Sequence, residues 1–415
     1  MDVDVIVIGA GLAGLTAARH LEAAGRRVQV LEAGTKVGGR VATDRVDGFL
    51  CDRGFQVLNP AYPQVRREVD LDALDLQKFT PGVDLVSPEG VARLADPVRS
   101  PGDLPATLRS GIVPTDATAL RQLTGLARWV VPALASPGGQ SEVPWGERLD
   151  AVGAGGLGRR ALERFLAGVL LEEDGSTSAP VVAQLLRWFL LGTPGLPVEG
   201  MGALPAQLAG GLRQPVALGQ AAHRVVARDG ALAVETADGT HVARQVVVTV
   251  APQQVQGLLG PDGPALPVAR MKGVTTWWFT APEPPTADPV LRVDGTARRG
   301  PVVNTAVVTA AAPSYSATGA PLIEASVLHR GEGPVDEAGV RAHLAVLWGR
   351  SVADWEVVLR HEVPDALPDA VPGAGTPRNP DIGGGVFLGG DHWGGASIQG
   401  AMQSGARAAE AALRA

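Results

Sequence analysis

The first 32 residues of the chain restrict its fold more than any other segment. A nearly continuous apolar, β-branched run at 3–8 leads into the pattern G-x-G-x-x-G at 9–14, and the segment 12–24 has apolar residues at helical spacing. A second apolar run at 28–31 ends at the acidic residue Glu32. This order of strand, glycine turn, helix and strand predicts a βαβ unit that opens a parallel, Rossmann-type sheet.

Each glycine of the turn has a physical task in dinucleotide binding. Gly9 permits the tight turn, Gly11 lets the backbone approach a pyrophosphate, and Gly14 lets the helix pack closely on the strand. The helix N-terminus presents free N–H groups and a positive dipole end to the phosphates. The carboxylate of Glu32 can accept both ribose hydroxyls of an adenosine, and its charge disfavours NADP. The predicted cofactor contacts in this unit are Gly9, Gly11, Leu12, Ala13, Gly14, Glu32 and Ala33.

A second glycine pair follows the βαβ unit. Gly38, Gly39 and Arg40 lie just beyond Glu32, where a glycine pair and a cation can close over the pyrophosphate. NAD-binding enzymes rarely need such a second clamp. With these motifs the sequence resembles the flavin-containing amine oxidase superfamily, which includes phytoene desaturases and protoporphyrinogen oxidases. The resemblance implies FAD as the cofactor.

Three more stretches match the pattern of this superfamily. The resemblance implies that 52–56 passes beside the isoalloxazine ring and that Val225 gives a backbone contact to adenine. It also implies that 389–391 and 397–401 close the flavin site, with Asp391 on the ribityl chain. The cofactor contacts implied in these stretches are Gly54, Phe55, Gln56, Val225, Gly390, Asp391, Ser397, Ile398 and Gln399.

The length of the chain favours two domains, because 415 residues are too many for one typical compact core. We expect an α/β fold in which a Rossmann-type FAD-binding domain of the two-dinucleotide-binding-domain class is interleaved with an α+β substrate domain. The expected cofactor segments are 1–75, 200–265 and 376–415. The expected substrate segments are 76–199, which is mostly helical, and 266–375, which is rich in strands.

Few side chains qualify as catalytic, since hydride transfer to a flavin needs positioning and exclusion of water more than an acid or a base. His392 follows Asp391 and can approach the ring; the alternative is a cap or a packed surface residue. Amine oxidases hold a lysine near flavin N5 through water, and Lys272 is the candidate here. It lies about two residues before the position that the resemblance implies, so a solvated lysine is the alternative. The acidic cluster 172–174 is interpreted as a solvated helix end.

The helix expected from Ile398 has a physical role independent of the resemblance. With its N-terminus aimed at the pyrimidine edge of the flavin, its partial positive charge would stabilise the anion that develops when N5 accepts a hydride. An ordinary amphipathic C-terminal helix satisfies the same pattern.

The composition of the chain limits the kinds of partner it can bind and the cell compartment in which it is expected. A net charge of −7 offers no positive field for a nucleic acid, so we expect a small-molecule partner. The single cysteine, Cys51, is expected in a buried strand. One cysteine excludes an internal disulfide, which fits a reducing compartment. No histidine has the spacing of metal ligands. The start of the chain lacks signal-peptide features and no apolar run reaches membrane-spanning length, which predicts a cytoplasmic protein. The apolar segment 126–135 is either a buried helix or a peripheral membrane contact; the oligomeric state is left open.

The expected reaction is the transfer of a hydride from an apolar substrate, such as an isoprenoid or polyene, to flavin N5. Apolar segments at 165–171 and 181–191, with the pair Trp277-Trp278, can line a tunnel for it, or simply form the core. An amine oxidase would carry an aromatic cage residue where this chain has Ser397. An amine or amino-acid oxidase is the first alternative. A redox-neutral flavin-dependent isomerase or FAD-binding module is the second, because no compelling acid or base is evident.

Overall fold

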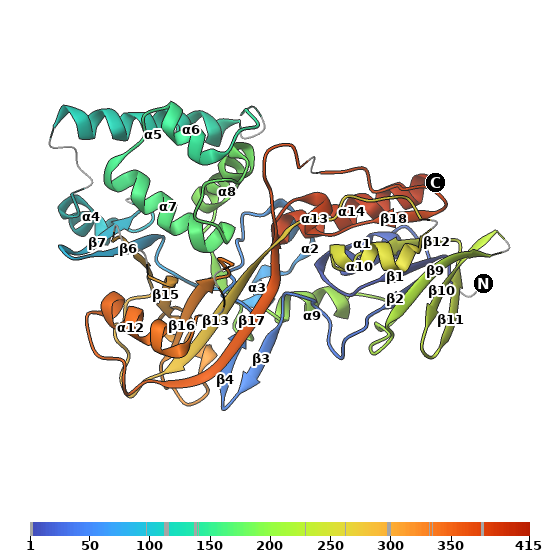
Figure 1. Cartoon of the computed structure of the whole chain (residues 1–415). Helices are drawn as coiled ribbons and strands as arrows, with labels where there is room; N and C mark the ends of the chain where they lie inside the picture. The colour runs from blue at the N-terminus through green and yellow to red at the C-terminus, as the bar shows by residue number, and fades with distance from the viewer. Residues whose placement is uncertain are drawn as a thin grey trace.

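The chain folds into two lobes with an elongated outline (Figure 1). Both ends of the chain lie in the first lobe, at the right of Figure 1, and the middle of the chain builds most of the second. The computed structural model describes residues 3–96, 98–111, 116–136, 139, 141–228, 230–261, 263–296, 300–331, 333, 335–374 and 377–415.

The first lobe is built on a four-stranded parallel sheet. β1 (Val5–Ile8) lies between β12 (Gln245–Val248) and β2 (Val28–Leu31), and β18 (Val386–Leu388) completes the order β18-β12-β1-β2. All four residues of β1 are buried, which is the environment that a continuous β-branched run predicts. With α1 (Leu12–Ala23) as the crossover, the predicted βαβ unit and the Rossmann-type α/β class are confirmed.

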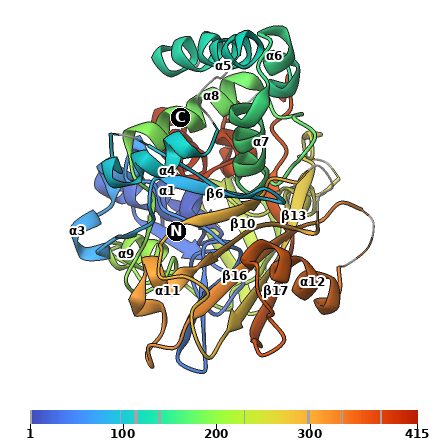
Figure 2. The ribbon, with the colours of Figure 1, turned by 90° about the vertical axis from the view of Figure 1, so that its left-hand side faces the viewer.

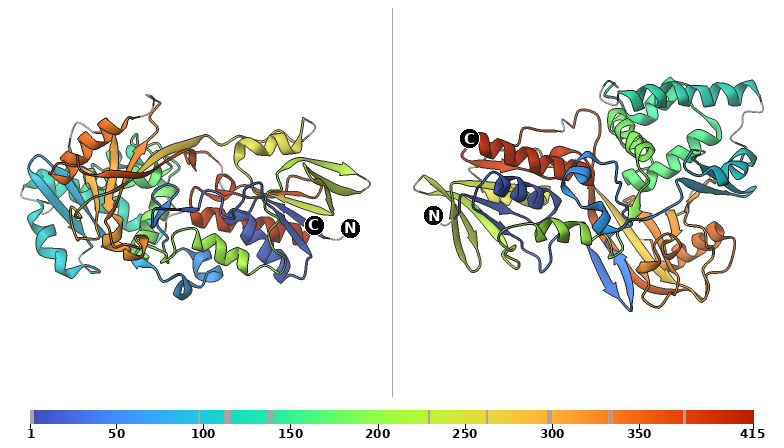
Figure 3. Two further views of the ribbon diagram at one scale, coloured as in Figure 1. Left: turned by 90° about the horizontal axis from the view of Figure 1, so that it is seen from below. Right: turned by 180° about the vertical axis from the view of Figure 1, so that it is seen from behind.

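The last helix, α14 (Ile398–Arg414), packs along α1 in this lobe. Figure 3 shows the two helices side by side. They approach closely at Gly405, where a β-carbon would collide with the carbonyl oxygen of Ala13 and lie 3.0 Å from the Ala13 Cα. The first and last helices of the chain are therefore in contact through backbone atoms.

An antiparallel meander extends the first lobe. It consists of β9 (Ala222–Arg228), β10 (Ala231–Thr236) and β11 (Gly239–Ala243), and the chain then enters β12 and the helix α10 (Pro252–Leu259). The meander is therefore followed directly by a strand of the parallel sheet.

The second lobe is built on a seven-stranded sheet in the order β17-β13-β16-β15-β14-β6-β7. β13, β15 and β16 form its antiparallel centre, and β14 pairs with β6 in parallel. The strand bounds are β6 (Gly82–Ser87), β7 (Gly90–Ala95), β13 (Met271–Thr280), β14 (Leu291–Asp294), β15 (Val302–Val307), β16 (Leu322–Leu328) and β17 (Glu356–Pro368).

Helices cover both faces of this sheet (Figure 2). On one face α12 (Glu337–Trp348) packs on Ile323, Ala325 and Val327 of β16. The other face meets α7 (Gly156–Leu170), which packs with α5 (Ala117–Ala135), α6 (Trp145–Ala151) and α8 (Ala179–Leu191) in a separate hydrophobic cluster. The division of the chain into the five predicted segments stays a prediction.

The close approach of α1 and α14 predicts a large effect of one methyl group. Gly405→Ala should lower the free energy of unfolding by ~1–3 kcal/mol or more, because the new β-carbon collides with a backbone carbonyl that cannot rotate away. Gly210→Ala is the matched control: Gly210 is an exposed residue at the end of α9 (Ala203–Gly210), and a β-carbon there would meet no atom within 4 Å. Urea unfolding of both variants measures the difference. Equal effects of the two substitutions would refute the proposed backbone contact.

Candidate functional site

A cavity of about 1640 Å³ runs between the two lobes. One half is lined by the turns that follow β1, β2, β12 and β18, and the other half by α7, α8 and strands of the second lobe. Ligands of open parallel sheets bind at the carboxyl ends of the strands, so the first half is the expected place for a nucleotide.

The glycine turn after β1 presents bare backbone to this cavity. Gly11 is the N-cap of α1, no side chain caps the helix, and its first turn contains no acidic residue. A β-carbon at Gly11 would meet no protein atom within 4 Å. Gly38 bridges to Gly11, and the Gly38 N–H donates to the Ala10 carbonyl at 2.8 Å. The two glycine segments therefore form one surface with free helix N–H groups, which fits a pyrophosphate.

Gly14 lies on the opposite side of the turn, away from the cavity. A β-carbon there would collide with the carbonyl oxygen of Gly9 and lie 2.6 Å from Thr249 Oγ1. Its task is the close packing of helix on strand that the sequence predicts.

Glu32 lines the cavity at the end of β2. Its carboxylate accepts hydrogen bonds from the backbone N–H groups of Ala10 and Gly34, both at 2.7 Å. A carboxylate has about four acceptor positions. The two backbone amides therefore fix the orientation of the group and leave acceptor capacity for ribose hydroxyls.

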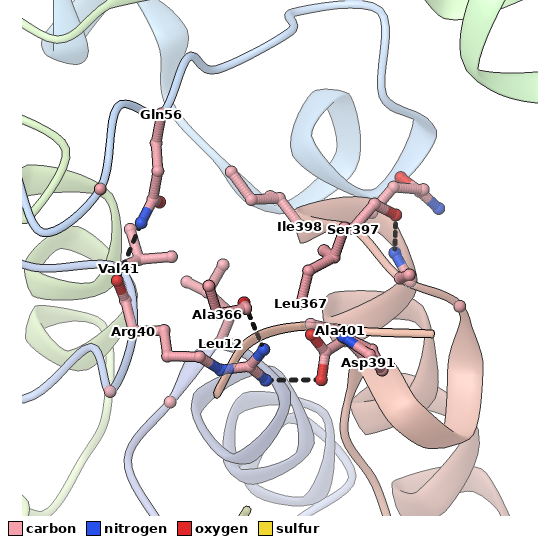
Figure 4. A pocket seen from close by; sticks show the side chains of 18 of the residues that line it. Leu12, Arg40, Val41, Gln56, Ala366, Leu367, Asp391, Ser397, Ile398 and Ala401 are labelled. Carbon is pink, nitrogen blue, oxygen red and sulfur yellow. Dashed lines mark hydrogen bonds and ion pairs between the residues drawn. The ribbon is translucent and has the colours of Figure 1, made fainter. Parts of the chain in front are cut away.

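An ion pair joins the beginning and the end of the chain in the cavity wall (Figure 4). The Arg40 guanidinium lies 2.5 Å from Asp391 Oδ1 and donates a second hydrogen bond to the Ala366 carbonyl at 2.9 Å. Burial alone would raise the pKa of Asp391, but the charge of Arg40 and the side chains of His392 and Arg40 hold it below its ordinary value. Asp391 therefore lines the cavity as a carboxylate.

Residues from the two other predicted segments complete this half. The Gln56 side chain donates to the carbonyls of Arg40 and Arg53, both at 2.9 Å, and Gly54 lies beside it with φ of +86°. At the start of α14, the Ser397 hydroxyl accepts the Gly400 N–H at 3.0 Å (Figure 4). The cavity lining includes Gly9, Gly11, Leu12, Ala13, Glu32, Ala33, Gly38, Gly39, Arg40, Gly54, Phe55, Gln56, Gly390, Asp391, Ser397, Ile398 and Gln399.

The structure differs from the sequence-based expectation at Val225. Val225 is 8% exposed, belongs to a hydrophobic cluster and does not line the cavity; the wall at this end comes from Gln220 to His223 instead. Sequence reasoning also missed Thr249, which lines the cavity at the end of β12. Its signal was available, because Thr249 follows a predicted parallel strand at the edge where ligands bind.

The interpretation of Lys272 as a solvated lysine is wrong. Its side chain is 12% exposed, and the ammonium lies 2.5 Å from Glu172 Oε2 and 3.1 Å from Asp369 Oδ1. The ammonium also donates to the Leu170 carbonyl at 3.3 Å. Lys272 lines the cavity, but its three protons already face four acceptors once the Thr177 hydroxyl at 3.4 Å is included.

The interpretation of the cluster at 172–174 as a solvated helix end fails for the same reason. Glu172 is buried and accepts hydrogen bonds from Trp145 Nε1 at 3.0 Å and from Thr177. Burial would raise the pKa of Glu172, but the Lys272 ammonium and these donors hold it below its ordinary value. The sequence did not show this because the partners lie far away along the chain.

His392 also differs from the alternative of a cap or surface residue. It is 5% exposed, lines the cavity, and its Nδ1 has no hydrogen-bond partner among the described residues. Cys51, by contrast, is confirmed as a buried residue of β4 (Phe49–Asp52), and burial raises the pKa of its thiol to about 12.

The second half of the cavity has an apolar wall. Phe165 and Phe189 meet edge-on with ring centroids 5.0 Å apart, and Trp188 meets Tyr62 in the same way at 4.9 Å. These residues line the cavity from α7, α8 and the segment before α2 (Pro63–Glu68). Residues from both apolar segments, 165–171 and 181–191, therefore line the cavity, and others of the same segments form a hydrophobic core. The pair Trp277-Trp278 does not contribute, because both side chains are buried in hydrophobic clusters.

The described residues contain neither a metal-ion cluster nor a membrane-spanning helix. Among them, no group of three or more His, Cys, Asp and Glu side chains could hold a metal ion. Within the same part of the chain, no helix has both the length and the apolar character to cross a bilayer.

Comparison with known proteins agrees with this geometry. The family model of flavin containing amine oxidoreductases matches residues 12–413. Putrescine oxidase from Kocuria rosea is 44% identical over 89 residues, which are 21% of this chain and only 19% of that protein.

Two solved structures share the fold. One, from Exiguobacterium sp. 255-15 and assigned as a protoporphyrinogen oxidase, has a TM-score of 0.75 at 20% identity over 100% of both chains. The other, a CLA-producing fatty acid isomerase from P. acnes, has a TM-score of 0.71 at 16% identity over 100% of this chain and 98% of that chain. At such identities the likeness shows the fold alone.

Asp52, behind the Gly54 wall, gives the site a measurable pH dependence. It is buried and accepts hydrogen bonds from Thr43 Oγ1 at 2.5 Å, Tyr315 OH at 2.8 Å and the Met201 N–H at 3.0 Å. Burial raises its pKa to about 6, although the three donors act in the opposite direction.

An aspartate in the unfolded chain titrates near ~3.9. The stabilising contribution of protonated Asp52 is therefore complete below that pH and is lost as the pH rises through about 6. The free energy of unfolding of the wild type minus that of Asp52→Asn should fall by roughly 3 kcal/mol between about pH 4 and pH 7. Urea unfolding of the FAD-loaded proteins measures this difference. Tyr315→Phe, which removes one donor, should move the fall to higher pH, and a difference independent of pH would contradict the assignment.

Proposed function

The chain belongs to the family of flavin-containing amine oxidoreductases and is a flavin-dependent oxidoreductase with FAD as its cofactor, and from this premise we propose that it takes a hydride from a largely apolar organic substrate. The observation that carries the proposal is the apolar wall of the cavity beyond the glycine turns. Phe165, Leu185 and Trp188 contribute to this wall from two helices. A molecule such as an isoprenoid or polyene matches it because burial of apolar surface is favourable and roughly proportional to area.

The charged groups of the wall support the same substrate class. Among the described residues lining the second half, Glu142 is the one carboxylate, and it is exposed at the rim. Lys272 is neutralised by Glu172 and Asp369. Ser397 stands where an amine oxidase would carry an aromatic cage residue, and its hydroxyl caps α14. A cationic substrate would thus lack a buried partner along the apolar wall.

We assign the cofactor contacts to the predicted residues that line the first half. The N–H groups around Gly11 and Gly38 bind the pyrophosphate, Glu32 binds the adenosine ribose, and Asp391, held by Arg40, binds the ribityl chain. Bound FAD supplies a two-electron acceptor for the hydride. The apolar wall orients the substrate against this acceptor and excludes water.

The two catalytic candidates take different roles in this proposal. His392 lines the cavity beside Asp391, with its Nδ1 3.8 Å from Asp391 Oδ1, so we assign it to the catalytic contact. The protons of Lys272 are committed to Glu172, Asp369 and the Leu170 carbonyl, so we treat it as a positioning residue. Its ion pairs join α7 to β13 and to the segment after β17.

Two alternatives retain specific support. The match to putrescine oxidase from Kocuria rosea favours an amine oxidase, although it covers only 19% of that protein. The shared fold with the fatty acid isomerase from P. acnes favours a redox-neutral reaction on an apolar chain. A phytoene desaturase-like reaction, a cytoplasmic location and a peripheral membrane contact stay predictions.

The cofactor assignment predicts that one methyl group weakens FAD binding without unfolding the protein. Gly11 has ordinary extended backbone angles, φ −74° and ψ 178°, and a β-carbon there meets no protein atom. Gly11→Ala should therefore fold normally but raise the Kd for FAD by about tenfold or more, since the methyl group occupies the place of the pyrophosphate. Fluorescence titration of the apoprotein with FAD measures this. Gly210→Ala is the control, and unchanged FAD affinity in Gly11→Ala would reject the assignment.

The substrate assignment is tested by anaerobic reduction of the bound FAD. A panel of polyenes and isoprenoids should bleach the flavin absorbance near 450 nm, whereas simple amines and amino acids should not. Bleaching by amines alone would favour the amine oxidase. Movement of a double bond with no bleaching by any compound would favour the isomerase.

A further inference from the structure

The floor of the second half of the cavity carries a row of polar side chains on three adjacent strands. Thr276 of β13, Ser326 of β16 and Asn304 of β15 are paired neighbours in the sheet register. Glu324 lies two residues before Ser326 and so projects from the same face. All four residues are at most 5% exposed, and Ser326 and Asn304 line the cavity.

Much of the hydrogen-bonding capacity of this row is unused. Ser326 Oγ donates to Glu324 Oε2 at 3.0 Å. Glu324 Oε1, Asn304 Oδ1 and Thr276 Oγ1 are buried and have no hydrogen-bond partner among the described residues. Buried polar atoms are paired in more than about nine cases in ten, with protein, water or ligand. Of these three residues, Asn304 lines the cavity, next to Ser326. The incompletely paired Asn304 amide and the neighbouring hydroxyl indicate a ligand group that pairs with them.

The row is held in place on both sides. The opposite face of the sheet packs Ile323 and Ala325 against α12. Above the row, α7 comes so near that a β-carbon at Gly168 would collide with Asn304 Nδ2 and lie 3.2 Å from its Cγ. The Asn304 amide is therefore confined between β15 and α7 while its Oδ1 stays without a partner.

We propose that this row recognises an uncharged hydrogen-bonding group, a hydroxyl or a carbonyl, at the end of the substrate that lies away from the glycine turns. The inference rests on the proposed function, because it divides the same apolar substrate into a reacting part and a polar end. Figure 1 shows β15 and β16 on the side of the molecule away from β1 and α1, which places the row at that end.

The chemistry of the row excludes a charged group. The Asn304 amide and the Ser326 hydroxyl belong to residues that line the cavity, whereas Glu324 does not line it. Burial raises the pKa of Glu324 well above its ordinary value, which favours the neutral form of its carboxyl. An ammonium or carboxylate bound there would lose its hydration without gaining an opposite charge, and that loss costs far more than a neutral hydrogen bond returns.

The test compares two eight-carbon ligands, 1-octanol and n-octane, on the FAD-loaded protein. Equilibrium dialysis with headspace gas chromatography gives both Kd values, and the ratio of the octane Kd to the octanol Kd measures recognition of the hydroxyl. Asn304→Leu combined with Ser326→Ala should lower this ratio at least about tenfold, because the partners of the hydroxyl are removed. Gln184→Leu is the matched control: Gln184 also lines the cavity, but from α8, so the ratio should not change.

Two further measurements separate the outcomes. Glu324→Gln should keep the ratio within about threefold of the wild type, since an amide preserves the neutral partner of Ser326. The proposal would be overturned by an unchanged ratio in the double variant. It would also be overturned if octylammonium bound more tightly than octanol and Glu324→Gln abolished that difference. Dialysis needs no turnover, so a failure of the proposed oxidation appears in the flavin bleaching test and leaves this result intact.

Discussion

The cavity exists because backbone segments from distant parts of the chain approach one another with no side chain between them. A β-carbon at Gly14 would collide with the Gly9 carbonyl, and one at Gly405 with the Ala13 carbonyl. Gly38 forms a backbone bridge to Gly11. These contacts bring the first helix, the second glycine pair and the last helix to one place. The result is a surface of backbone N–H groups that a phosphate can approach closely.

Ion pairs perform the second task of assembly, because they join segments that lie far apart along the chain. Arg40 pairs with Asp391, 351 residues further along, and Lys272 pairs with Glu172, 100 residues before it. Desolvation makes such pairs costly unless their charges are matched and hydrogen-bonded. Both conditions are met here: backbone carbonyls and hydroxyls take up the remaining protons of the two cations. Both cations thus have carboxylate partners, and an apolar molecule can lie against this wall.

The cofactor half of the site was readable from the sequence because its chemistry belongs to the backbone. The turn at 9–14, the strand bounds of β2 and β18, and the bounds of α14 all follow from local patterns of glycine and apolar residues. Val225 lies outside the cavity lining, which at this end comes from Gln220 to His223, because the meander sets which residues of β9 turn to the cavity. A glycine motif specifies a backbone shape, and that shape is nearly the whole of a phosphate site.

The substrate half is recognised by side chains, whose neighbours depend on strand pairing and helix packing. Nothing in the sequence around Lys272 shows that Glu172 and Asp369 surround it. The sequence around Trp277-Trp278 likewise does not show that the two rings are buried on opposite faces of the sheet. Thr276, Asn304 and Ser326 lie in three separate segments and meet only through the register of β13, β15 and β16. A parallel sheet offers its strand ends to a ligand and an antiparallel sheet offers its face. The cofactor is therefore encoded in short motifs, whereas selectivity for the substrate is encoded in the topology.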